Sequence, residues 1–122
     1  MAVEVLSSWG KKKLTLRGTA GRLLFSARRR ARNKEIGFSI SRDWIEDTAI
    51  SNKLRCHRTG IPFDFSGESL HPFQMSLDRL DSRGAYSPDN VEVVCLMYNL
   101  CKSTRSYEEV MVFARALVGY SG

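Results

Sequence analysis

The chain has 122 residues, a formal net charge of +6, 43% hydrophobic residues and 26% charged residues. This composition is typical of a globular protein, and the length suits one domain or one small domain with an appendage. No apolar run approaches the roughly 20 residues of a membrane-spanning helix, and the N-terminus lacks the charged-then-apolar layout of a secretory signal. We therefore expect an intracellular protein with no membrane partner.

The positive charge is concentrated in the first 34 residues. This segment holds ten Lys and Arg against one acid, whereas residues 35–122 hold nine Lys and Arg against twelve acids. Such segregation is typical of an arm that binds a polyanion. Taken alone, the charge is explained equally well by a solvated basic face.

In chain order, the first predicted elements are two helices. Residues 1–18 are expected to form a tail, and Thr19 to cap a helix over residues 20–34 that ends at Gly37. One face of that helix is apolar and is expected to be buried. Its members are Ala20, Leu23, Leu24, Ala27 and Ala31. Ser41 can cap a second helix at about 42–54, which we expect to be scaffold.

The next predicted elements are a hairpin and two more helices. Residues 75–80 read as a strand, residues 81–90 as a loop, residues 91–95 as the returning strand and residues 96–103 as a helix. Ser106 and Glu109 predict a capping box for a last helix. The expected buried stripe of that helix is Val110, Phe113, Ala114 and Leu117. The order of elements predicts an α+β fold.

Three spaced polar residues suggest a site on this hairpin. Asp78 lies in the first strand, Asn90 opens the second strand, and Asn99 lies in the following helix. A hairpin followed by a helix can bring Asp78 and Asn99 together, and their oxygens suit a hard cation such as Mg²⁺ or Mn²⁺. Asn90 can pin the loop by hydrogen bonds to its backbone. Each residue alone is better explained as a surface or turn residue, but the set favours a site.

The same region resembles a known family. The runs SLDRLDSRGAYSPDNVEVVCLMYNLCK (residues 76–102) and CHRTGIPF (residues 56–63) look like the HNH nucleases encoded by many bacteriophages. The family pattern is an Asp-His pair, an Asn opening the second strand, then Cys-x-x-Cys-(His/Asn)-x-x-Lys. Its matches here are Asp78, Asn90, Cys95, Asn99 and Lys102. The resemblance covers roughly residues 56–104.

This resemblance implies a ββα-metal core with flanking N-terminal and C-terminal helices. Residues 1–55 would then be a basic arm and helices that bind DNA, and residues 56–122 an HNH nuclease core with a C-terminal helix. The implied activity is Mg²⁺- or Mn²⁺-dependent hydrolysis of DNA phosphodiester bonds. Asp78 and Asn99 would hold the metal, and Asn90 would orient the loop. A phage origin would place the protein in the cytoplasm of a bacterial host.

Arg79 departs from this pattern, because the family has its general-base histidine there. Arginine has no lone pair to accept a proton, but it can contact the scissile phosphate and stabilise developing charge. The base would then be a histidine, a tyrosine or a water on the metal. Of the two histidines we prefer His71 over His57, because the segment leading into the first strand can fold over its end. Tyr86 is a further alternative.

A second departure concerns zinc. Related proteins often carry two Cys-x-x-Cys pairs, but here the pairs are Cys56 with Thr59 and Cys95 with Tyr98. Two thiolates do not close a tetrahedral site. We therefore expect no structural zinc, with apolar packing around Tyr98 and Phe63 in its place. Cys101 is expected to be a buried helix residue.

The expected partner is the phosphate backbone of double-stranded DNA. The residues expected to contact it are Arg28, Arg29, Arg30, Arg32 and Lys102, with Lys11 to Lys13 in the tail. One active site would nick one strand, so a double-strand cut would need a homodimer or a second visit. Three alternatives stay open: an HNH-like DNA-binding module that has lost cutting, a phage-encoded protein-interaction factor, and a ribonuclease.

Overall fold

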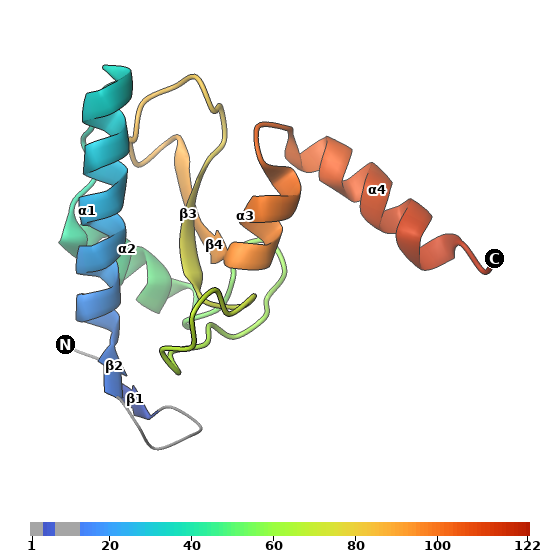
Figure 1. Ribbon diagram of the computed structural model, residues 1–122, viewed down its shortest axis with the longest axis horizontal. Helices are drawn as coiled ribbons and strands as arrows, with labels where there is room; N and C mark the ends of the chain where they lie inside the picture. Colours follow the sequence, from blue (N-terminus) through green and yellow to red (C-terminus); the bar gives the residue numbers. More distant parts are fainter. Residues whose placement is uncertain (1–3, 7–12) are drawn as a thin grey trace.

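The computed structural model describes residues 4–6 and 13–122, with side chains from Leu14 onward. Its elements are β1 (Glu4–Leu6), β2 (Lys13–Thr15), α1 (Leu16–Lys34), α2 (Arg42–Ser51), β3 (Met75–Arg79), β4 (Val91–Cys95), α3 (Leu96–Lys102) and α4 (Tyr107–Gly119) (Figure 1). β3 and β4 pair antiparallel, with Met75 opposite Cys95 and Arg79 opposite Val91. The expected α+β arrangement of a hairpin between helices is confirmed.

The N-terminal segment differs from the predicted tail. β1 pairs antiparallel with β2, and α1 begins at Leu16 rather than at residue 20. Thr15 is the cap, because its hydroxyl accepts a hydrogen bond from the amide of Gly18 at 2.9 Å. Leu16 has no exposed surface and extends the buried apolar face by one turn, which the shorter prediction missed. Lys11 and Lys12 lie outside the described residues, as does the side chain of Lys13.

Helix α1 ends at the predicted residue, Lys34, although not at the predicted glycine cap, whereas α2 ends sooner than predicted. α1 ends at Lys34 because Glu35 adopts a left-handed conformation (φ 55°), and its amide donates to the carbonyls of Ala31 and Arg32. Gly37 is therefore not the cap. The predicted Ser41 cap of α2 is confirmed by its bond from the Trp44 amide at 3.0 Å. α2 ends at Ser51 rather than near residue 54, because residues 53–54 are left-handed.

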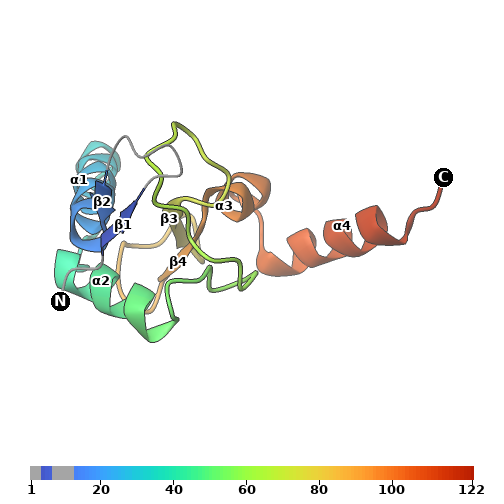
Figure 2. The ribbon, with the colours of Figure 1, turned by 90° about the horizontal axis from the view of Figure 1, so that it is seen from below.

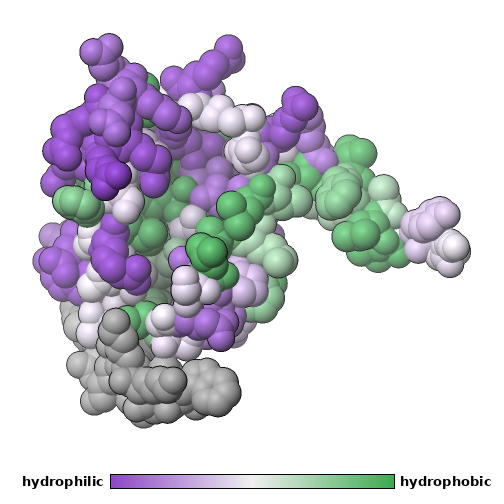
Figure 3. Space-filling model, in the orientation of Figure 1, coloured by the Kyte–Doolittle hydropathy of each residue, from purple (hydrophilic) through white to green (hydrophobic). Residues whose placement is uncertain are grey.

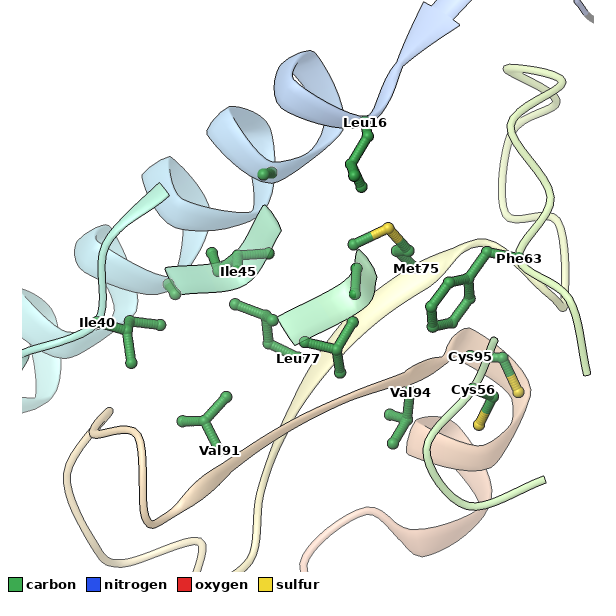
Figure 4. Packing of buried hydrophobic residues seen from close by; sticks show 14 of the residues in the cluster. Leu16, Ile40, Ile45, Cys56, Phe63, Met75, Leu77, Val91, Val94 and Cys95 are labelled. Atoms are coloured by element: carbon green, nitrogen blue, oxygen red, sulfur yellow. The ribbon is translucent and has the colours of Figure 1, made fainter. Parts of the chain in front are cut away.

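The hydrophobic core lies where α1 and α2 pack against the hairpin (Figures 2 and 4). β3 contributes Met75 and Leu77, and β4 contributes Val91 and Val94, all in one cluster with Ala20 and its neighbours on α1. Residues from both halves of the chain thus share a core. The division into a DNA-binding part (1–55) and a nuclease part (56–122) stays a prediction.

The last helix is where the predicted packing is wrong. The capping box of Ser106 and Glu109 is present, but α4 has no buried residue. Phe113 is 57% exposed and Leu117 is 67% exposed, because the chain turns outward after Ser103 and α4 points away from the body (Figures 1 and 2). None of the described helices combines the length and apolarity needed to cross a bilayer.

Candidate active site

A polar cavity of about 420 Å³ lies between α1, β3, the loop after β3 and the end of α3. The helix α1 contributes Arg22, Leu23, Ser26 and Arg30 to its lining. The strand β3 and the residue before it contribute Gln74, Ser76, Leu77, Asp78 and Arg79. The rest of the lining comes from the loop (Ser82 and Tyr86) and from α3 and the residues after it (Asn99, Ser103 and Thr104). Three of the predicted catalytic residues, Asp78, Arg79 and Asn99, therefore meet in one hollow with Arg30, a predicted DNA contact.

Asp78 is a buried carboxylate with one unsatisfied oxygen. Its side chain is 3% exposed, and Oδ1 accepts a hydrogen bond from Nζ of Lys102 at 3.1 Å. Oδ2 is buried without any hydrogen-bond partner. Burial raises the pKa of this carboxyl, and the hydrogen bond and charge of Lys102 act in the opposite direction. An orphaned carboxylate oxygen beside a polar cavity is what a bound cation would satisfy.

Asn99 presents the second candidate ligand. Its Nδ2 donates to Oγ of Ser76 at 2.7 Å and to the carbonyl of Leu77 at 3.0 Å. Because the Leu77 carbonyl can only accept, the amide nitrogen must face it, and Oδ1 is the atom left for other partners. Both candidate ligands are therefore held by β3. Asp78 is part of the strand, and Asn99 is hydrogen-bonded to Ser76 and Leu77 of the same strand.

These donors fit the group that the fold implies. A carboxylate and an amide oxygen are hard ligands, and Mg²⁺ takes one or two from a protein with the rest from water and phosphate. Within the described residues, no group of three or more His, Cys, Asp and Glu side chains could hold a metal. A carboxylate and an amide oxygen thus suit a hard divalent cation whose remaining ligands come from outside the chain.

Asn90 makes the hydrogen bonds expected of a residue that fixes the loop. Its Oδ1 accepts from the amide of Asp81 at 2.9 Å, while Nδ2 donates to the carbonyls of Asp81 and Ala85 at 3.1 and 2.9 Å. Gly84 lies directly over this amide, since a Cβ there would be 2.7 Å from Nδ2 of Asn90. Asn90 therefore shapes the loop that carries Tyr86, at a position that does not line the cavity.

Arg79 is fixed between the loop and an aromatic ring. Its Nη1 donates to the carbonyl of Gly84 at 2.9 Å, and its guanidinium lies 4.7 Å from the ring centre of Tyr86. Arg30 reaches the same residue from α1, with Nε donating to the Tyr86 hydroxyl at 3.0 Å. The two arginines and Tyr86 form a positively charged cluster on the cavity wall.

The histidines lie elsewhere. His71 does not line the cavity: its Nδ1 accepts from the amide of Phe73 at 3.1 Å, and its Nε2 faces Asp64 at 3.7 Å. His57 is near Glu92, with 3.3 Å between its Nε2 and the carboxylate. The structure therefore does not bring His71 together with Asp78, Arg79 and Asn99.

The basic residues divide into two groups. Arg28, Arg29, Arg30 and Arg32 are exposed on α1, as expected of residues that contact phosphate. Lys102 is 1% exposed, and besides Asp78 it donates to the carbonyl of Arg79 at 3.1 Å. A side chain so deeply buried has no surface to offer DNA, so the expected phosphate contact of Lys102 is not retained. Its place is inside the fold, as the counter-charge of Asp78.

Two cysteines lie next to the hairpin: Cys56 in the segment before it and Cys95 at the end of β4. Cys56 and Cys95 are buried side by side at the ends of their segments (Figure 4). Tyr98 and Phe63 belong to the same apolar cluster, and burial raises the pKa of Tyr98 to about 12. Cys101 is exposed, contrary to expectation, because it faces outward on α3, away from Asn99 and Lys102.

Sequence reasoning missed the contribution of α1 to the cavity. Arg22, Ser26 and Arg30 line it at intervals of four residues, which places them on one face of the helix. That spacing is visible in the sequence. It does not single out Arg30, because Arg28, Arg29 and Arg32 lie beside it in the sequence and are exposed to solvent.

The β3–β4 hairpin, the helix α3 that follows it and the cavity beside them define an HNH-type nuclease fold. A solved structure with the same fold is that of the rare-cutting HNH restriction endonuclease PacI. It is 20% identical to this chain, with a TM-score of 0.60, and the match covers 82% of this chain and 77% of that one. No model of a known protein family matches the sequence, and neither does any curated protein.

Proposed function

We propose that this chain is a metal-dependent DNA endonuclease that hydrolyses phosphodiester bonds and nicks one strand per site. The observation that carries the proposal is the pairing of an unsatisfied buried oxygen on Asp78 with a free amide oxygen on Asn99 at one cavity. Mg²⁺ or Mn²⁺ held there would neutralise phosphate charge and stabilise the leaving oxygen. The HNH-type fold supports this proposal, because Asp78 lies on β3 and Asn99 on α3, two of the elements that define the fold.

The chain's own residues would position the substrate. Arg79 and Arg30 line the cavity, so a phosphate entering it meets two guanidiniums that stabilise negative charge. Arg79 is already anchored by Gly84 and Tyr86, which reduces the loss of side-chain freedom when it binds. Asn90 would act indirectly, because it holds the loop whose Gly84 carbonyl anchors Arg79.

The general base is open between three candidates. Tyr86 lines the cavity and accepts a hydrogen bond from Arg30, but it would have to give up its own proton before it could act as a base. A cavity water is the second candidate. His71 is the third, but its contacts with Phe73 and Asp64 would have to break for it to reach the site. Geometry therefore favours Tyr86 or water over His71.

The exposed arginines of α1 support DNA as the substrate. Arg28, Arg29 and Arg32 lie on the helix that forms one wall of the cavity, so contacts of these residues with a DNA backbone would lead a strand toward Asp78. The same chemistry would cut RNA. A DNA-binding module without cutting remains the second candidate, because Arg79 occupies the position of the family's base.

The test is cleavage of a supercoiled plasmid with Mg²⁺, Mn²⁺ or EDTA. Wild type should nick in either metal and not in EDTA, and Asp78→Asn should lose nicking by about three orders of magnitude. Asp47→Asn makes the same charge change at an exposed position on α2 and should nick like wild type. Plasmid that is bound but never nicked would favour the binding module, and structured RNA cleaved in preference would reassign the substrate.

A further inference from the structure

Helix α4 is apolar on nearly all sides. Of its 13 residues only Glu108, Glu109 and Arg115 are charged, and none is buried. A helix that is hydrophobic all round is normally covered by other protein, and a helix this short is marginal in water by itself. We call its exposed residues Val112, Phe113, Leu117 and Val118 the apolar arm.

A second apolar surface lies on the outer face of α3. It is a hollow of about 540 Å³, the α3 groove, lined by Leu70, Pro72, Leu96, Met97, Leu100 and Cys101. Leu70 is 76% exposed and Leu100 is 68% exposed. Cys101 also lines a hollow with Val110 and Phe113 at the junction of α3 and α4, so the groove runs into the apolar arm. Figure 3 shows hydrophobic residues along this side of the molecule.

The charges on this side exclude a nucleic acid as the occupant. The charged residues beside the arm are Arg105, Glu108, Glu109 and Arg115, two of each sign, and Arg105 lies 3.9 Å from Glu109. The positive charge of the chain is instead gathered on α1. Two copies of a net-positive protein can approach each other most easily through such a neutral face.

We propose that the occupant is a second copy of this chain, with the apolar arm of each copy lying in the α3 groove of the other. The chain carries both halves of the contact, and α4 extends away from the body of the molecule (Figures 1 and 2). The arrangement is self-complementary, as a two-fold dimer requires. A helix of this length is about 20 Å long and 10 Å wide. By that footprint an arm and a groove give each copy an interface of roughly 400 Å², about half of the roughly 800 Å² per partner of a standard interface, which suits association in the micromolar range.

The proposed interface leaves the polar cavity open. None of the residues that line the α3 groove lines the cavity, because Asn99 and Lys102 face inward on α3 while Met97, Leu100 and Cys101 face outward. Dimer formation therefore does not depend on the proposed nuclease activity, and either can fail without the other.

The test is sedimentation equilibrium of the full chain through the micromolar range. Wild type should associate as two chains, and the double variant Phe113→Glu with Leu117→Glu should dissociate at least about 100-fold more readily. Phe25→Glu is the matched control, because Phe25 is 63% exposed on α1 and outside the interface. It should associate like wild type. Circular dichroism should show the same folded body in all three proteins.

Two further readouts separate this dimer from other states. Leu100→Lys, in the groove, should also be monomeric, and mixing it with Phe113→Glu should restore association through the intact arm of one and the intact groove of the other. Iodoacetamide should label Cys101 more slowly in the dimer than after dilution, since Cys56 and Cys95 are buried. A wild type that stays one chain throughout, a Leu100→Lys protein that still dimerises, or a monomer that floats with phosphatidylglycerol vesicles would overturn the proposal.

Discussion

Helices α1 and α4 both carry apolar residues at helical spacing, but these residues are buried in α1 and exposed in α4. In α1, Ala20, Ala27 and Ala31 are buried against the hairpin and α2, and Arg28, Arg29 and Arg32 face solvent. In α4, Phe113 and Leu117 are themselves in solvent. Helical periodicity shows that a face suits an apolar neighbour, but not whether that neighbour belongs to the same chain.

The two regions also differ in how their polar groups are used. The α1 side surrounds a cavity in which Asp78, Asn99 and Arg79 are each held by specific hydrogen bonds. The α4 side has few charges and a single i,i+4 ion pair among its described contacts. We interpret the first region as built for substrate and the second as built for assembly, and paired variants can test this contrast.

The largest expected effect on stability comes from breaking the buried pair beneath the cavity. Lys102→Met leaves the Asp78 carboxylate buried without its counter-charge, which should cost about 3–5 kcal/mol of unfolding free energy. Arg115→Met removes a cation from exposed α4 and should change stability by less than about 0.5 kcal/mol. Urea unfolding of both variants measures this. A Lys102→Met protein as stable as wild type would mean that the pair is not essential to the fold.

The second contrast concerns DNA affinity. Replacing Arg28, Arg29 and Arg32 together by Gln should lower affinity, and should reduce the slope of log K against log salt by about 2–3. Arg30 is kept, because it holds Tyr86. Arg115→Gln on α4 should leave both quantities unchanged. Fluorescence anisotropy across a salt series measures them, and equal losses from the two helices would remove the distinction between the regions.

A pair of glycines gives a third contrast. Gly84→Ala places a Cβ 2.7 Å from the Asn90 amide, so the loop must shift, at a cost of about 1–3 kcal/mol and with slower nicking as Arg79 loses its anchor. Gly119→Ala on α4 meets nothing within 4 Å and should be neutral or slightly stabilising. Thermal unfolding and nicking rates check both. If Gly84→Ala nicks at the wild-type rate, the loop conformation is not needed for activity.

These contrasts also show how far sequence reasoning reaches. The strand β4, the capping box of α4 and the loop bonds of Asn90 follow from local patterns, and the structure has them. The burial of Lys102 and the exposure of Cys101 do not follow, because both depend on which face of the short helix α3 meets β3. The start of α1 at Leu16 does not follow from the local pattern, because Gly18 lowers the helix propensity of the turn that Thr15 caps.

The smallest effect concerns Tyr98, next to Asn99. Its hydroxyl is buried without a partner, so Tyr98→Phe should stabilise the protein by about 1 kcal/mol at pH 7. Its folded-state pKa of about 12 lies above the ordinary value of 10, so the unfolded chain loses this proton first and the free energy of unfolding falls as the pH rises from 10 toward 12. Unfolding between pH 9 and 12 should show a shallower loss in Tyr98→Phe. Tyr120→Phe, 81% exposed beyond α4, should match wild type.

The central claim is that Asp78 and Asn99 hold the cation of a nuclease site, and a Mn²⁺ titration of plasmid nicking tests it most directly. Asn99→Ala removes one proposed ligand and should raise the half-saturating Mn²⁺ concentration by about tenfold or more, whereas Asp47→Asn should leave it at the wild-type value. If Asn99→Ala slows nicking but leaves the Mn²⁺ dependence unchanged, Asn99 supports β3 without binding metal, and the assignment of the site is contradicted.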